Sequence, residues 1–186
     1  MPSISHATST LRRPLSIVGL RLFLVTAAMV VGNLALPYAV HRIPDAGRML
    51  LPIFFFTLVA GWRFGARAGV ITGLLSPLAN HLLTGMPPTS MLQAIILQSA
   101  LLGLLAAPMG ARGLKPTLAR LAVVVLAHQI LMVLPGLVQS GPAAAVAGLR
   151  LHLPAILLQI LGGYGILCLL APAKPETESH RVGLKA

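Results

Sequence analysis

Residues 61–77 read GWRFGARAGVITGLLSP and place four glycines at intervals of four, at Gly61, Gly65, Gly69 and Gly73. An interval of four puts small residues on one face of a helix. In a lipid bilayer such a face lets a second backbone approach closely, because helices associate there largely through packing. The stretch therefore predicts a tightly packed membrane bundle, in which this face serves either helix packing or the docking of a partner.

The composition of the whole chain agrees with a membrane protein. Hydrophobic residues make up 56% of the 186 residues and charged residues only 9%. An ordinary soluble domain of this length could not carry so apolar a surface. Six helices of about 20 residues would take up most of the chain, which leaves no room for a soluble catalytic domain. We therefore expect a protein that is not an enzyme.

We expect an all-α integral membrane protein of about six transmembrane helices. The chain divides into an N-terminal tail (1–14), a six-helix membrane domain (15–172) and a C-terminal tail (173–186). Pro77 is expected to break or kink the third helix, residues 85–88 to end it, and residues 108–116 and 135–142 to interrupt the later helices. The second and third helices are short, so they are either two tilted spans or a hairpin that crosses in part. The expected helices cover residues 20–40, 49–62, 67–83, 90–109, 117–139 and 151–171.

The cations indicate the orientation. If the six helices alternate in direction, all but three of the 14 Lys and Arg residues fall on the side that holds both termini; the exceptions are Arg42, Arg48 and Arg150. The net charge of +11 therefore indicates the orientation of the chain in the membrane and does not indicate nucleic-acid binding. By the positive-inside rule both termini are cytoplasmic, and the loops around 41–48, 84–90 and 140–150 face outward.

Acidic residues are rare, and this excludes several activities. The only three are Asp45, Glu176 and Glu178, and none lies in a predicted helix. Ion-driven carriers and metal-dependent membrane enzymes need carboxylates in or at the membrane. The chain also lacks a Walker-type phosphate loop and the His-Glu-x-x-His and Gly-x-Ser-x-Gly motifs. Uphill transport would therefore need an energised partner.

The run Gly-x-x-Phe-Gly-x-x-x-Gly-x-x-x-Gly-x-x-Ser-Pro (61–77) lies between Gly-Arg-Met-Leu-Leu-Pro (47–52) and Leu-Leu-Thr-Gly-Met-Pro-Pro (82–88). Together these segments resemble the substrate-binding S components of energy-coupling factor (ECF) ABC transporters. The resemblance implies a small six-helix protein of a prokaryotic cell membrane that captures a vitamin, a vitamin precursor or a metal ion on the outer side. It also implies inward delivery by toppling, driven by a transmembrane coupling protein with two ATPase subunits.

The same resemblance implies a docking surface on the first helix. Members of the family often use an Ala-x-x-x-Ala pattern there to contact the coupling protein. The nearest equivalents in this chain are Ala28 with Gly32, and Ala35 with Ala39. The glycine face at 61–73 is a second candidate surface.

Polar residues in and beside the predicted helices are the candidates for a substrate site. Asn80 and His81 precede the outer turn, where they either line a pocket or satisfy backbone groups that Pro77 leaves free. His128 and Gln129 fall near the middle of the fifth helix, where a polar side chain must face protein or water. Glutamines on the fourth and sixth helices could read the amide or heterocycle edge of an uncharged ligand, although each alone is more often a packing contact. The candidates are Asn80, His81, Gln93, His128, Gln129, Gln159 and, on a cationic outer rim, His41, Arg48 and Arg150.

Two alternatives remain open, beside a self-sufficient facilitator or secondary carrier, which the lack of carboxylates disfavours. A small membrane scaffold without a ligand would have the same composition. A nickel- or cobalt-binding S component is the other, because the segment from His41 to Gly47 loosely resembles the His-Ile-Pro-Asp-Gly opening of that subgroup, and His81 and His152 could add ligands. We expect no bound cofactor, since no metal or cofactor motif is complete.

Overall fold

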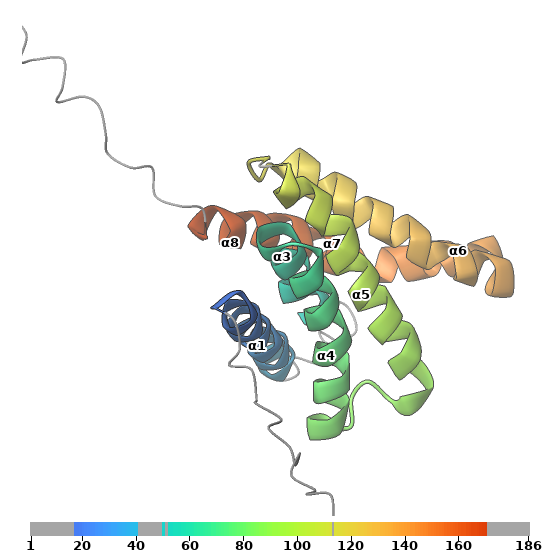
Figure 1. The fold of residues 1–186 in the computed structure, drawn as a ribbon. Coiled ribbons are helices and arrows are strands. Elements are labelled where there is room, and N and C mark those ends of the chain that lie inside the picture. The colour runs from blue at the N-terminus through green and yellow to red at the C-terminus, as the bar shows by residue number, and fades with distance from the viewer. Residues whose placement is uncertain (1–16, 41–49, 51, 113, 171–186) are drawn as a thin grey trace, which may run out of the picture.

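The computed structural model describes residues 17–40, 50, 52–112 and 114–170, and the regular elements in these ranges are all helical (Figure 1). The expected all-α class is therefore confirmed. In chain order the elements are α1 (Ile17–Val40), the 3₁₀ helix η1 (Pro52–Phe54), α3 (Phe55–Phe64), α4 (Ala66–Thr84), α5 (Thr89–Ala111), α6 (Leu118–Leu151), α7 (Leu153–Leu157), the π-helical η2 (Leu158–Gly162) and α8 (Gly163–Leu169).

Two of these helices are long and apolar enough to cross a membrane. They are the segment Val18–Ala39 of α1 and the whole of α5. A third span is present if Gly141–Leu151 and Leu153–Leu169, which meet at an angle of 49°, form one broken crossing. Pro52–Phe64 and Leu118–Leu134 are apolar but shorter. The structure thus supports a membrane protein, and the number of six spans stays a prediction.

Helix α3 lies at the centre of the described fold. It packs against α1, α4, α5 and α8, and residues 57–62 are all buried. A helix that is apolar on all sides is expected in such a position. Its Leu58 and Trp62 join the core with Leu102 of α5 and Leu121 and Val125 of α6.

Three of the four spaced glycines bring helices close together. A Cβ atom on Gly69 would lie 2.7 Å from Gly61 Cα, and one on Gly73 would lie 2.6 Å from Ala100 N. Gly61 meets the carbonyl group of Gly103 on α5 in the same way. No side chain fits at these distances, so glycine permits the contact of α3, α4 and α5. The contacts are internal, as the helix-packing interpretation requires.

Gly65 does something different. It has φ 89° and ψ 177°, a conformation nearly restricted to glycine, and it separates α3 from α4. A Cβ atom there would meet nothing within 4 Å. The interpretation of Gly65 as part of the packing face is therefore wrong, because the four-residue interval runs across two helices instead of along one.

The helix breaks expected at Pro77 and at 135–142 fall within α4 and α6. Pro77 does not break its helix, since α4 continues through it to Thr84, and the alternative of a kink stays a prediction. The predicted interruption at 135–142 is present as a kink at Gly141 (φ 80°, ψ 172°), which divides the long α6 (Leu118–Leu151) into two helical parts. The expected stop after α4 is present: Gly85 adopts φ 75° and its N–H donates to His81 O at 2.8 Å.

Candidate ligand site among the helices

A buried network of polar side chains joins four helices. Asn33 Nδ2 on α1 donates to Thr57 Oγ1 on α3 at 3.0 Å and to Ser76 Oγ on α4 at 2.9 Å. Thr57 Oγ1 is also 3.1 Å from Ser99 Oγ on α5. All four side chains are fully buried. In an apolar surrounding such a network fixes the positions of the helices that carry it, because each unpaired group would be costly.

Asn33 also caps the start of α3. Its Oδ1 accepts a hydrogen bond from Phe56 N at 2.9 Å. The first N–H groups of a helix have no partner within the helix, so this contact satisfies one of them. Sequence reasoning missed Asn33, Thr57 and Ser99 as members of a network. A single asparagine within a long apolar helix was the available signal, since polar residues in such helices face protein or water.

His128 occupies a polar position in the middle of the bundle. Its side chain is buried on α6, and Nε2 lies 3.1 Å from Gln98 O on α5. Its ring meets the ring of Phe54 edge-on, with the centroids 5.8 Å apart. The other ring nitrogen, Nδ1, is buried and has no hydrogen-bond partner among the described residues. His128 therefore retains hydrogen-bonding capacity that the described protein does not use.

Two glutamines have the same property. Gln129 Nε2 on α6 and Gln159 Oε1 in η2 are buried without a partner in the described part of the chain. Buried polar atoms without partners are rare in folded proteins, and a bound molecule is one explanation for them. Gln159 moreover lies in a π-helical segment, an irregularity that is frequent at functional sites.

The elements that carry these residues pack together, because α6 contacts η2. A Cβ atom on Gly163 would lie 3.2 Å from Leu58 Cδ2 on α3 and 3.7 Å from Leu121 Cδ2 on α6. Gly163, Leu58 and Leu121 therefore lie at the same level, where the three segments meet. From that level, Gln159 is one turn away along η2. His128 is two turns away along α6, on the side of Phe54, whose ring it meets. We call the group His128, Gln129 and Gln159 the polar junction.

Asn80 and His81 are engaged in the loop between α4 and α5. His81 Nδ1 lies 2.7 Å from Pro87 O. Thr84 Oγ1 donates to Asn80 O at 2.7 Å and accepts from Met86 N at 3.2 Å. Asn80 is buried, and His81 is half-buried. These contacts favour the alternative in which the two residues organise the turn, and their part in ligand binding stays a prediction.

The remaining candidates are dispersed. Gln93 on α5 and Arg150 near the end of α6 are exposed. Ala28 is exposed on α1, whereas Gly32 faces inward, where an added Cβ would lie 2.8 Å from the Phe56 ring. The two residues therefore do not form one exposed docking face. His41 and Arg48 lie outside the described residues.

Metal binding finds no support in the described part of the chain, where no group of three or more His, Cys, Asp or Glu side chains is placed to hold an ion. Comparison with models of protein families, with curated proteins and with solved structures finds no match to this chain.

Proposed function

We propose that this chain is a membrane-embedded substrate-binding subunit that takes up a small, uncharged polar molecule at the polar junction. The observation that carries the proposal is that three of the four buried side-chain polar atoms without partners in the described residues, His128 Nδ1, Gln129 Nε2 and Gln159 Oε1, lie on α6 and η2, which pack against each other. The fourth is Thr72 Oγ1 on α4. A scaffold without ligand gains nothing from such atoms, because leaving a buried polar group unpaired costs about 1–3 kcal/mol.

The chemistry of these atoms suggests the class of ligand. Gln129 Nε2 is a donor, Gln159 Oε1 is an acceptor, and a histidine Nδ1 serves as either one. A planar amide or nitrogen heterocycle presents donors and acceptors side by side and matches this set. A charged ligand is disfavoured, since no Asp or Glu occurs among the described residues to balance a cation and the junction holds no Arg or Lys to balance an anion.

The orientation follows from the distribution of charge. We propose six crossings with both termini in the cytoplasm, because Lys and Arg then concentrate on one side, as in other proteins of the inner membrane. Helix α4 (Ala66–Thr84), the apolar segments at Pro52–Phe64 and Leu118–Leu134, and the bent pair after Gly141 supply the four crossings beyond α1 and α5. Helix α3 is short for a membrane span. We propose that it can still form a crossing because it lies at the centre of the bundle, where the surrounding helices separate its ends from lipid.

Transport would need partners. Since the chain carries no motif for nucleotide hydrolysis, we propose that it works as the S component of an ECF-type importer, with a coupling protein and two ATPase subunits. The motif at 61–77 and its flanks support this assignment. The proposed cargo is a vitamin, a vitamin precursor or a similar micronutrient.

A thermal-shift screen tests the proposal. The detergent-purified full chain is heated with B vitamins, their precursors, nickel and cobalt, because a ligand that binds the folded state raises its unfolding temperature. We expect a shift with one neutral heterocyclic compound, and loss of that shift in the variant Gln159→Leu. A well-folded protein that responds to none of these compounds would favour the scaffold, and a response to nickel or cobalt alone would favour a metal carrier.

A further inference from the structure

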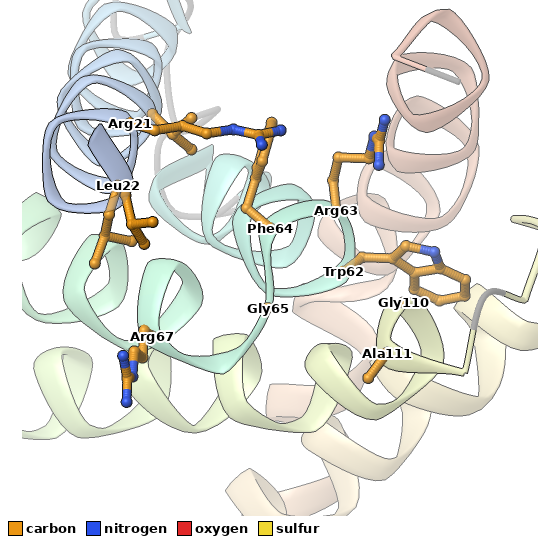
Figure 2. Close-up of a pocket in the computed structure, with 11 residues that line it drawn as sticks. Arg21, Leu22, Trp62, Arg63, Phe64, Gly65, Arg67, Gly110 and Ala111 are labelled. Atoms are coloured by element: carbon orange, nitrogen blue, oxygen red, sulfur yellow. The ribbon is translucent and has the colours of Figure 1, made fainter. Parts of the chain in front are cut away.

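A groove of about 470 Å³ lies where α1 begins, α3 ends and α4 begins (Figure 2). Three arginines from three helices line it: Arg21 on α1, Arg63 on α3 and Arg67 on α4. Figure 2 shows Arg21 extending from α1 toward α3, and Arg67 on the first turn of α4, beyond the Gly65 turn. We call this the arginine groove. Much of its remaining lining is apolar, namely Val18, Leu22, Val25, Trp62 and Phe64.

The positive charge of the arginine groove is not balanced within the described residues. The three acidic residues of the chain all lie outside those residues. Arg63 Nε donates to Leu170 O at 3.1 Å, a neutral acceptor that leaves the charge in place. In addition α4, a helix of 19 residues, begins in the groove without a side-chain cap, so its dipole adds positive potential there. The groove therefore favours an anion.

A second groove, of about 410 Å³, is wholly apolar. It runs between α1, α3 and the α7–α8 segment, from Leu36 and Phe55 to Ile166 and Leu169. Leu169 is next to Leu170, whose carbonyl oxygen accepts the hydrogen bond from Arg63. The hydrogen bond between Arg63 and Leu170 thus brings one end of the apolar groove within one residue of a contact made by the arginine groove. A dissolved phosphate would bind in the arginine groove alone. A phospholipid can place its phosphate in the arginine groove and an acyl chain in the apolar groove.

We infer that the two grooves together hold one anionic phospholipid, with its headgroup phosphate at Arg21, Arg63 and Arg67 and one acyl chain in the apolar groove. Basic pockets between membrane helices on the cytoplasmic side are typical sites for such headgroups, and the arginine groove lies on the side that the charge distribution assigns to the cytoplasm. This inference rests on the proposed orientation of the chain in the membrane, with both termini in the cytoplasm. It does not depend on which molecule the protein transports.

The test is native mass spectrometry of the full chain in detergent, mixed with phosphatidylglycerol or with zwitterionic phosphatidylcholine. We expect preferential retention of phosphatidylglycerol, and a loss of about tenfold or more in the variant Arg21→Gln/Arg67→Gln, which leaves the bond from Arg63 to Leu170 intact. The control Arg112→Gln/Lys115→Gln removes two charges from the same predicted side outside the groove, and it should retain the lipid like the unmodified protein.

A second pair of variants tests the acyl chain. Gly165 lines the apolar groove, and a Cβ atom there meets nothing within 4 Å, so Gly165→Leu fills the groove without a backbone clash. Gly148→Leu adds the same side chain in open space away from both grooves. We expect only Gly165→Leu to reduce retention of phosphatidylglycerol.

Three results would overturn the inference. Equal retention of the two lipids would exclude a site selective for the anionic headgroup. Full displacement of phosphatidylglycerol by an equal concentration of glycerol 3-phosphate would show a site for soluble phosphates. Unchanged retention in Gly165→Leu would exclude the acyl chain from the apolar groove. Because no vitamin is present in these measurements, their failure is distinct from a failure of the ligand screen.

Discussion

Asn33 on α1 donates a hydrogen bond to Ser76 on α4, with 2.9 Å between Nδ2 and Oγ, although 43 residues separate them in the chain. The same side chain reaches Thr57 Oγ1 and Phe56 N on α3. One asparagine thus joins three helices. Hydrogen bonds between membrane helices average about 0.6 kcal/mol each, so a side chain with three of them has a measurable effect on folding.

We predict that Asn33→Leu lowers the free energy of unfolding by about 1–3 kcal/mol, because Phe56 N and the two hydroxyl groups lose their partner within the core. Unfolding of the detergent-solubilised protein in increasing SDS measures the change. The control is Thr26→Ala on the same helix, whose hydroxyl donates to Leu22 O one turn away within that helix. If the two variants unfold alike, the network does not hold the helices together.

We predict that Gly69→Ala destabilises the bundle by about 1–3 kcal/mol, the usual cost of overpacking. The added methyl group would lie 2.7 Å from Gly61 Cα and 2.8 Å from Gly103 O, and these are backbone atoms that cannot move aside alone. Gly148→Ala serves as the control, since it meets open space and should stabilise its helix slightly. A stable Gly69→Ala variant would refute the close approach of α3, α4 and α5.

The sequence predicted the helices and the tight packing because both depend on local patterns. Apolar runs bounded by Gly and Pro placed most helix ends close to their observed positions. It failed at Gly65, which serves a turn that equal spacing does not reveal. It also failed in the break expected at Pro77, because α4 continues through its proline. Among the site residues, Gln129 and Gln159 lie on packed elements because α6 contacts η2, a tertiary contact that no spacing in the sequence encodes.

We predict that Gln159→Leu separates stability from binding. Removing the buried Oε1 atom that lacks a partner should raise the unfolding temperature of the ligand-free protein or leave it unchanged, because an apolar side chain of similar size suits that position. The shift caused by the ligand should at the same time disappear. Thermal unfolding with and without the ligand measures these effects together.

The matched control for Gln159→Leu is Gln93→Leu, which changes an exposed glutamine on α5 and should preserve the ligand shift. A Gln159→Leu variant that loses stability and keeps its response to the ligand would assign Gln159 to packing, and the polar junction would then have no claim to be the binding site.

The last prediction compares two glycines with equally open surroundings. A Cβ atom on Gly65 or on Gly165 meets nothing within 4 Å, but Gly65 has φ 89° whereas Gly165 lies within α8. We predict that Gly65→Ala lowers the free energy of unfolding by about 1–3 kcal/mol through backbone strain. Gly165→Ala should raise it by about 0.5–1 kcal/mol, because alanine is the better helix former. Unfolding in SDS measures the two variants side by side. If the two variants changed the free energy of unfolding equally and in the same direction, the turn between α3 and α4 would not require a residue with positive φ. The break between these helices at Gly65 would then have a different cause.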